Sequence, residues 1–82
     1  MKAEILTPDA HVFEGEADVI TLPGATGSFQ ILDNHAPMIA ILQKGDIVVK
    51  ARGGQEQHFQ TTGGVVEVAD NKVAVLAEGI AK

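Results

Sequence analysis

The 82-residue chain contains no cysteine, no tryptophan and no tyrosine. Without cysteine it can form no disulfide and can offer no thiolate to a metal or to catalysis, a composition that suits a reducing compartment. Three phenylalanines are its only aromatic residues. Binding of single-stranded nucleic acid often uses a row of stacking rings, so the scarcity of rings argues against that function.

Positive charge is also scarce. Six lysines and arginines stand against eleven aspartates and glutamates, for a formal net charge of −5. Proteins that bind nucleic acid need a cationic footprint, so the charge argues against a nucleic-acid partner. Solubility alone is a sufficient reason for the acidity.

Long hydrophobic runs are missing as well. No apolar run approaches the roughly twenty residues that a membrane-spanning helix requires. Residues 1–4 lack the long hydrophobic segment of a signal peptide. We therefore expect a soluble chain.

Short strands separated by turns are what the chain does contain. Turn signals recur about every eight to twelve residues, the spacing typical of an all-β sandwich or flattened barrel. A chain of this size is expected to form one domain, residues 1–82, that buries about two-thirds of the surface exposed on unfolding. We predict a flattened β-sandwich of roughly eight to ten short, mostly antiparallel strands, at 2–6, 11–14, 18–22, 29–32, 36–42, 47–50, 56–61, 65–68 and 72–76.

Turn residues set the expected ends of these strands. Gly15 is expected to close the second strand, and Asp70-Asn71, a pair that tolerates positive φ, to form a two-residue hairpin turn. Around Phe59 the polar neighbours predict a hairpin with one solvent-facing side.

The apolar segment 36–42 is too short and too β-branched for a helix. We predict a strand buried on both faces, with Met38, Ile39 and Ile41 mainly in the core. Phe29, on the preceding strand, has two interpretations: a core ring, which the alternation favours, or an exposed anchor for a partner.

Two tight loops frame one short strand in the most informative stretch, residues 19–42. Pro23 fixes how the chain enters the first loop, and Gly24 and Gly27 allow positive φ at either end. In the second loop, the side chains of Asp33-Asn34 can bond to neighbouring backbone amides. We expect both loops to lie at one pole of the sandwich, where they would grip a partner.

Several motifs around these loops carry a family resemblance. They are Thr7-Pro8, Val12-Phe13-Glu14-Gly15, Leu22-Pro23-Gly24, Gly27-Ser28-Phe29, His35-Ala36-Pro37, Lys44-Gly45, Thr62-Gly63-Gly64-Val65-Val66-Glu67-Val68 and Lys72-Val73-Ala74-Val75-Leu76-Ala77. In order and spacing they resemble the N-terminal β-sandwich domain of the epsilon subunit of rotary proton-translocating ATP synthases. One motif alone would be weak, but the set covers nearly the whole chain.

This resemblance implies a noncatalytic central-stalk subunit that links the gamma shaft to the membrane ring of c subunits, so that proton flow is coupled to ATP synthesis. It implies a peripheral location, on the cytoplasmic face of a bacterial inner membrane or the equivalent side of another energy-transducing membrane, reached only through partner subunits. Contact with the c ring is expected at Ala25, Thr26, Gly27, Ser28 and His35, and contact with gamma at Met38 and Ala40.

The chain departs from the family pattern in several places. Ser28 stands where many members carry a glutamate, which removes one negative charge from the expected contact with the c ring. Gln30 replaces a glycine and Asp33-Asn34 replace Pro-Gly, so the second loop is expected to differ in shape. The helical hairpin that usually follows the sandwich is missing, which fits either a naturally short form or a shortened chain. Its inhibitory switch and nucleotide site are not carried over.

No catalytic constellation is apparent. The three histidines, His11, His35 and His58, fall on separate expected elements, and a nucleophile needs a base within reach. On spacing alone, a lone loop histidine such as His35 most often satisfies a turn or faces water. We expect no catalytic residue.

No cofactor or metal site is expected either. The loop 24–28 lacks the lysine and the following helix of a phosphate-binding loop, so its glycines are expected to serve backbone geometry. The spacing of the acidic run matches no known calcium loop, and a solvated edge is the favoured interpretation. That run consists of Asp9, Glu14, Glu16 and Asp18.

One alternative comes from another class of protein. Biotinyl and lipoyl carrier domains are also about eighty residues long, acidic and all-β, with a modified lysine on an exposed hairpin. Lys44 and Lys72 both lie near a predicted turn and are the candidate attachment sites. The Met-Lys-Met and Asp-Lys-Ala signatures of such carriers are missing, and Lys72 lies close to the end of the chain.

Overall fold

Residues 1–81 are described by a computed structural model, which contains nine β-strands and no helix in that range. The strands are β1 (Lys2–Leu6), β2 (His11–Gly24), β3 (Gly27–Leu32), β4 (Met38–Leu42), β5 (Gly45–Ala51), β6 (Glu56–Thr61), β7 (Gly64–Ala69), β8 (Lys72–Ala77) and β9 (Ile80–Ala81). Within these residues no helix is present that could cross a membrane. The predicted all-β fold is confirmed.

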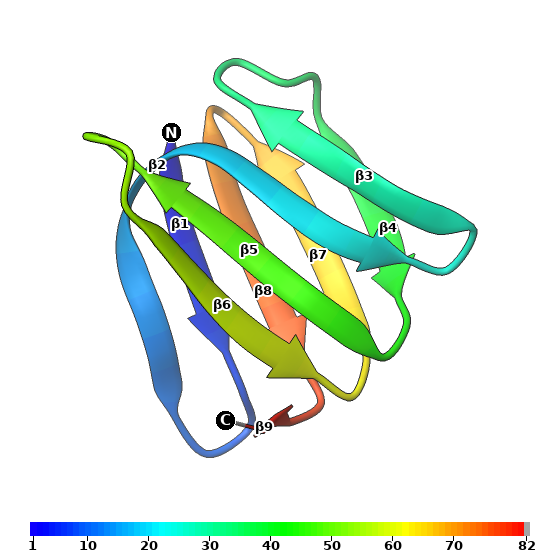
Figure 1. Cartoon of the computed structure of the whole chain (residues 1–82). Coiled ribbons are helices and arrows are strands. Elements are labelled where there is room, and N and C mark those ends of the chain that lie inside the picture. Colours follow the sequence, from blue (N-terminus) through cyan, green and yellow to red (C-terminus); the bar gives the residue numbers. More distant parts are fainter. Residues whose placement is uncertain (82) are drawn as a thin grey trace.

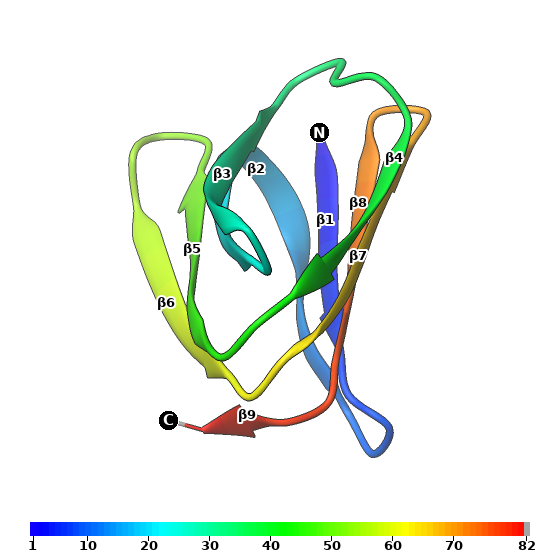
Figure 2. The ribbon, with the colours of Figure 1, turned by 90° about the vertical axis from the view of Figure 1, so that its right-hand side faces the viewer.

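The strands form two layers that pack face to face (Figures 1 and 2). The back sheet, farther from the viewer in Figure 1, has the order β4-β7-β8-β1, and the front sheet has the order β3-β2-β5-β6, with β9 added beside β6. Neighbouring strands are antiparallel except β1 and β8, which are parallel. The expectation of a mostly antiparallel sandwich is therefore confirmed.

Strand β2 belongs to both layers. Its first half pairs with β1 in the back sheet, and its second half pairs with β3 and β5 in the front sheet. The register shifts between Ala17 and Val19, and a bulge of this kind bends a strand and increases its twist. The prediction that Gly15 ends a strand is wrong, because Gly15 pairs with Ala3 inside the ladder and keeps a negative φ.

The core lies between the two layers. The front sheet contributes Ile20, Leu22, Ile31, Ile47 and Val49, and the back sheet contributes Ile5, Val66, Val73 and Val75, each at most 1% exposed. The ring of Phe59 is buried, with its centroid 5.8 Å from that of Phe13. Phe29 is half-buried and packs against this core, which agrees with the favoured core interpretation.

The turn between β7 and β8 follows the sequence prediction. Asp70 and Asn71 have φ of 52° and 57°, values that suit the two-residue turns whose twist matches that of the flanking strands. Strand β9 was not predicted from the sequence. Ile80, half-buried, pairs there with Thr61 of β6.

Strand β4 does not have the burial predicted for it. Ile39 and Ile41 are 70% and 68% exposed, whereas Met38 and Ala40 are half-buried and pack against the core. The prediction of burial on both faces is wrong, because β4 lies in a two-layer sandwich where only one face of each sheet is covered. Side chains alternate along a strand, so every second residue of this apolar segment faces outward.

Alanine substitutions at two isoleucines test this assignment. Ile20→Ala should lower the free energy of unfolding by about 2–5 kcal/mol because it empties a fully buried site. Ile39→Ala should change it by less than about 0.5 kcal/mol. Urea unfolding followed by far-ultraviolet circular dichroism measures both, since the chain has no tryptophan or tyrosine to report by fluorescence. A similar, large loss in both variants would contradict the outward orientation of Ile39.

Candidate partner-binding surface

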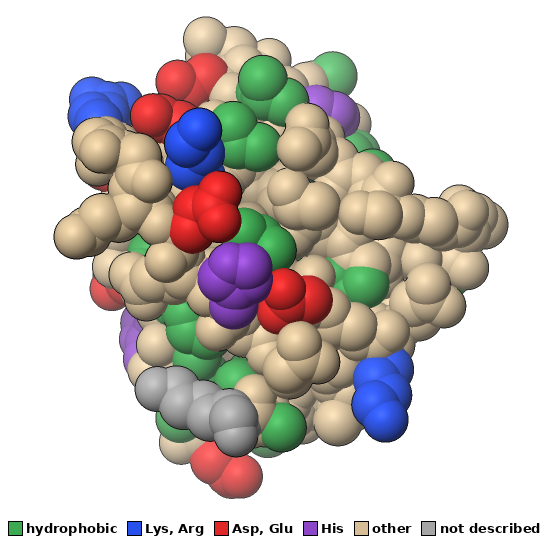
Figure 3. Space-filling model, viewed as in Figure 1, with side chains coloured by type: hydrophobic (Ala, Val, Ile, Leu, Met, Phe, Trp, Pro, Cys, Tyr) green, Lys and Arg blue, Asp and Glu red, His purple; other side chains and the backbone are tan. Residues whose placement is uncertain are grey.

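The outer face of the front sheet is mainly polar, although Leu32 at the end of β3 is 51% exposed. Figure 3 shows side chains of lysine, arginine, aspartate, glutamate and histidine spread across this face. The imidazole of His58 lies beside Asp46, with its Nδ1 2.8 Å from Oδ2, and this hydrogen bond raises the pKa of His58 above its usual value. The amide of Gln30 donates to the hydroxyl of Thr21 across the β2–β3 pair. Such a face needs no protein partner to cover it.

The outer face of the back sheet instead exposes large apolar side chains. We name Ile39, Ile41, Val65 and Leu76 the apolar patch; they are 70%, 68%, 36% and 50% exposed. Ile41 pairs with Val65, and Val65 pairs with Leu76, so three of the four form a line across β4, β7 and β8. Contiguous exposed apolar side chains of this kind mark interaction surfaces.

A groove lies beside the apolar patch, between the β2–β3 turn and β4. Its volume is about 570 Å³, and its lining consists of Gly24, Ala25, Thr26, Gly27, Ser28, Phe29, Met38, Ile39, Ala40 and Ile41. Every contact residue predicted from the sequence except His35 is therefore brought together here. The candidate contacts for the two partners share one continuous surface.

Backbone contacts fix the β2–β3 turn against β4. Gly24 pairs with Leu42, and the amide of Ala25 donates to the carbonyl oxygen of Ile41 at 3.0 Å. A Cβ atom on Gly24 would lie 2.6 Å from the carbonyl oxygen of Gly27, so only glycine fits. Gly27 has φ of 137°, as expected for one end of this loop, whereas Gly24 is required for space and not for positive φ.

His35 lies away from this groove. It is half-buried in the loop after β3, with its Nδ1 2.7 Å from the carbonyl oxygen of Ala36 and its amide donating to Leu32. One loop precedes β3 and the other follows it, and a six-residue strand spans about 17 Å. The expectation that both loops lie at one pole is therefore wrong, as Figure 1 also shows.

The loop after β3 is anchored at its own end of the sandwich. The carboxylate of Asp33 accepts a hydrogen bond from the amino group of Met1, which holds the pKa of Asp33 below its usual value. The amide of Asn34, whose φ is 62°, donates to the side chain of Asn71 at 2.7 Å. This loop thus ties β3 to the β7–β8 turn of the other layer.

The histidines lie apart, as the sequence predicts: His11 is on β2 and His58 on β6. Part of the acidic run is paired, because Glu16 and Asp18 each lie 3.8 Å from the guanidinium of Arg52.

One group of side chains that the fold brings together was not predicted from the sequence. Within residues 1–81 a single group of three possible metal ligands comes together, formed by Glu4, His11 and Glu14.

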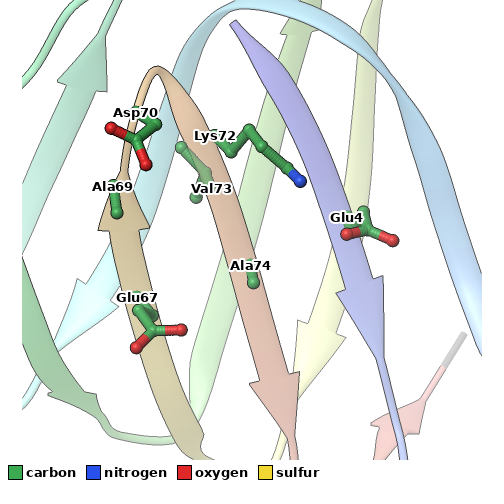
Figure 4. Close-up of a pocket in the computed structure, with 7 residues that line it drawn as sticks. All are labelled: Glu4, Glu67, Ala69, Asp70, Lys72, Val73 and Ala74. Carbon is green, nitrogen blue, oxygen red and sulfur yellow. The ribbon is translucent and has the colours of Figure 1, made fainter.

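Neither lysine of the carrier alternative lies at the tip of a β-hairpin, since β4 and β5 do not pair and Lys72 follows the β7–β8 turn. Lys72 starts β8, and its side chain lies along the outer face of the back sheet in a shallow pocket of about 250 Å³, which Glu4 and Glu67 also line (Figure 4). The tip of that hairpin is formed by Asp70 and Asn71 instead. Lys44 is exposed in the connection between β4 and β5.

The fold is a two-layer β-sandwich with an apolar patch and a groove on one side. The family model described as ATP synthase, Delta/Epsilon chain, beta-sandwich domain, matches residues 1–82. The chain belongs to this family, which confirms the resemblance found in the sequence. The carrier alternative gains no support.

Curated relatives are similar over almost the whole chain. The ATP synthase epsilon chain of Salinibacter ruber is 42% identical over 88 residues, which cover 98% of this chain and 59% of the relative. The ATP synthase epsilon chain of Nitratidesulfovibrio vulgaris is 45% identical, and the match covers 92% of this chain and 55% of the relative. The ATP synthase epsilon chain of Chlorobium limicola is 38% identical, and the match covers 96% of this chain and 90% of the relative. The chain thus spans little more than half the length of the first two relatives and most of the third.

Solved structures share the fold at lower identity. A chain in the cryo-EM structure of the Euglena gracilis mitochondrial ATP synthase, OSCP/F1/c-ring, matches with a TM-score of 0.89 at 21% identity, covering 96% of this chain and 51% of that one. A chain in the Tetrahymena thermophila mitochondrial ATP synthase, central stalk/c-ring, matches with a TM-score of 0.80 at 20% identity, covering 99% and 65%. These likenesses show that the sandwich fold is the same.

The pairing of Asp33 with the Met1 amine predicts a pH-dependent stability. The folded-state pKa of Asp33 is lowered, so its stabilisation is fully present above the ordinary value of 3.8 and is lost as pH falls through the folded value. Asp33→Asn should therefore be less stable than the parent near neutral pH, with the difference shrinking below pH 3.8. Thermal unfolding at a series of pH values measures it. A difference that grows on acidification would contradict this pairing.

Proposed function

We propose that this chain is a noncatalytic central-stalk subunit of a proton-translocating ATP synthase, which links the gamma shaft to the c-subunit ring so that proton flow is coupled to ATP synthesis. Membership of the Delta/Epsilon family over residues 1–82 carries the proposal. Relatives named ATP synthase epsilon chain, at 37–45% identity, support it. The chain would act as one domain, peripheral to the membrane and held there by its partners, on the cytoplasmic face of a bacterial inner membrane or its equivalent.

Stiffness is the physical property that this role requires. Torque passes through a linking subunit only if its two contact surfaces keep their relative positions. Here both layers share β2, and the core between them is built from tightly buried aliphatic side chains. Sliding one layer over the other would break ladder hydrogen bonds and core contacts together.

The gamma contact is assigned to β4 and the apolar patch. Ile39 and Ile41 offer the most exposed large apolar side chains, while Met38 and Ala40 line the groove on the other side of the same strand. Burial of exposed isoleucines gives a partner hydrophobic stabilisation without any reactive group. A shaft that lies along β4 would cover all four residues.

The c-ring contact is assigned to the turn formed by Ala25, Thr26, Gly27 and Ser28. All four residues are exposed, and the turn projects at one corner of the molecule (Figure 1). Short polar and small side chains suit contact with the polar loops of a ring. The family resemblance groups His35 with these four residues, but His35 lies at the other end of β3. A c ring that contacts the turn would therefore not contact His35.

Charge insertion into the apolar patch tests the gamma contact. The parent chain should bind purified gamma subunit in calorimetry under moderate salt, and Ile39→Glu should weaken binding by roughly tenfold or more because it buries a charge in an apolar contact. Leu32→Glu is the matched control, since Leu32 is 51% exposed on β3 of the front sheet, and it should bind as the parent does. No detectable binding by the parent, or equal weakening by both variants, would contradict the assignment.

Because the chain has no cysteine, single thiols can test the c-ring contact. Thr26→Cys should react with a maleimide in the free chain and be protected after assembly with gamma and the c ring. His35→Cys should keep its free-chain labelling rate. Mass spectrometry of the labelled chain measures both rates. Protection at residue 35 without protection at residue 26 would move the contact to the other end of β3.

A further inference from the structure

A cluster of three possible ligands lies on the outer face of the back sheet, where β1 meets the first half of β2. The Nε2 atom of His11 is 3.2 Å from Oε2 of Glu4 and 3.9 Å from Oε1 of Glu14. One ligand atom from each residue lies within 4.8 Å of the others. Both carboxylates therefore approach the same nitrogen of a single imidazole.

The strand register holds this cluster together. Glu4 and Glu14 are direct partners in the antiparallel β1–β2 ladder. Like charges in directly opposite positions destabilise a strand pair. The amino group of Lys2 lies 3.2 Å from Oε2 of Glu14, but this exposed ion pair provides little net stabilisation. Two carboxylates are thus held close together with incomplete compensation.

We propose that Glu4, His11 and Glu14 form a binding site for one divalent transition-metal ion of the zinc class. One imidazole nitrogen and two carboxylate oxygens are ligands that Zn²⁺ accepts, with water in the remaining position. Magnesium and calcium are poorer candidates, because they prefer oxygen-only surroundings and more ligands.

The distances suit this ion. Ligands at about 2.0–2.1 Å from a tetrahedral ion lie about 3.3 Å from one another. The atoms of His11 and Glu4 already have this spacing. The other two spacings both involve Glu14, whose ligand oxygen is 3.9 Å from His11 and within 4.8 Å of Glu4. The exposed side chain of Glu14 can rotate to shorten both.

A second histidine provides a contrast within the same chain. His58 also lies near two carboxylates, but Nδ1 faces Asp46 at 2.8 Å and Nε2 faces Glu56 at 3.5 Å. The two carboxylates are on different ring nitrogens, so they cannot meet at one ion together with a single imidazole nitrogen. His58 is therefore a matched control with similar exposure and two neighbouring carboxylates.

The proposed ion site is separate from the partner contacts. In the back sheet β2 is four strand spacings from β4, a separation of about 19 Å. An ion between Glu4 and Glu14 would fasten β1 to β2 and leave Ile39 uncovered. Failure of this site would not affect the assignment of the gamma contact, and failure of that assignment would not affect this site.

Calorimetric titration of the 82-residue chain with zinc chloride, in a buffer that does not chelate zinc, tests the site. One ion per chain should bind. His11→Gln and Glu14→Gln should each lower the affinity at least about tenfold, the effect typical of losing a group that a metal site depends on. His58→Gln should bind as the parent does, and Lys2→Gln should bind more tightly, because the competing ammonium is removed.

Two further measurements test zinc binding without relying on the heat of binding. Zinc should shift the Nε2 resonance of His11 in imidazole nitrogen NMR and leave both resonances of His58 unchanged. Zinc should raise the melting temperature of the parent more than that of Glu14→Gln, because an ion that binds the folded chain more weakly stabilises it less. Equal loss of binding in His11→Gln and His58→Gln, or binding that His11→Gln leaves intact, would overturn the proposal.

Discussion

The bend of β2 is the constraint on which the rest of the structure depends. One strand of 14 residues pairs with β1 as far as Glu16, with β5 from Ala17 across the bulge, and with β3 from Val19 onward. At the bend Ala17 is fully buried, and a larger side chain there would push the layers apart. Since the two layers share this strand, neither can move without the other. The end of the same strand places the turn at Gly24 against β4.

The two outer faces of the sandwich are consequently free to differ. The front sheet carries charged and polar side chains, while the back sheet exposes the apolar patch beside the groove. The apolar patch covers only part of the back sheet, because Glu4, His11 and Glu14 lie on β1 and β2 of the same layer. A rigid block with one localised apolar patch can be held by a partner in a single orientation. That property fits a linking subunit in a rotary machine and requires no catalytic group.

Features that depend on neighbouring residues, such as turns and strand ends, were largely predictable from the sequence. Proline, the Asp70-Asn71 pair and several glycines marked strand ends correctly, and the bounds expected for 2–6 and 56–61 agree with β1 and β6, whereas Gly15 lies inside β2. The sequence predicts which side chains of a strand face solvent where polar and apolar residues alternate, as around Phe59. On β4 this prediction failed, because an all-apolar segment does not indicate which of its faces is exposed to solvent. The position of His35 and the convergence of Glu4 with His11 depend on strand register, which one sequence does not show.

Methyl NMR of the isoleucines would test the central claim most directly, namely that β4 presents its outward side chains to the rotor shaft. With a soluble paramagnetic agent, the methyl signals of Ile39 and Ile41 should broaden strongly in the free chain, while those of the buried Ile20 and Ile31 should not. After saturation with gamma subunit, the account predicts that Ile39 and Ile41 become protected from the agent. Continued broadening of both signals in a demonstrated complex would contradict it.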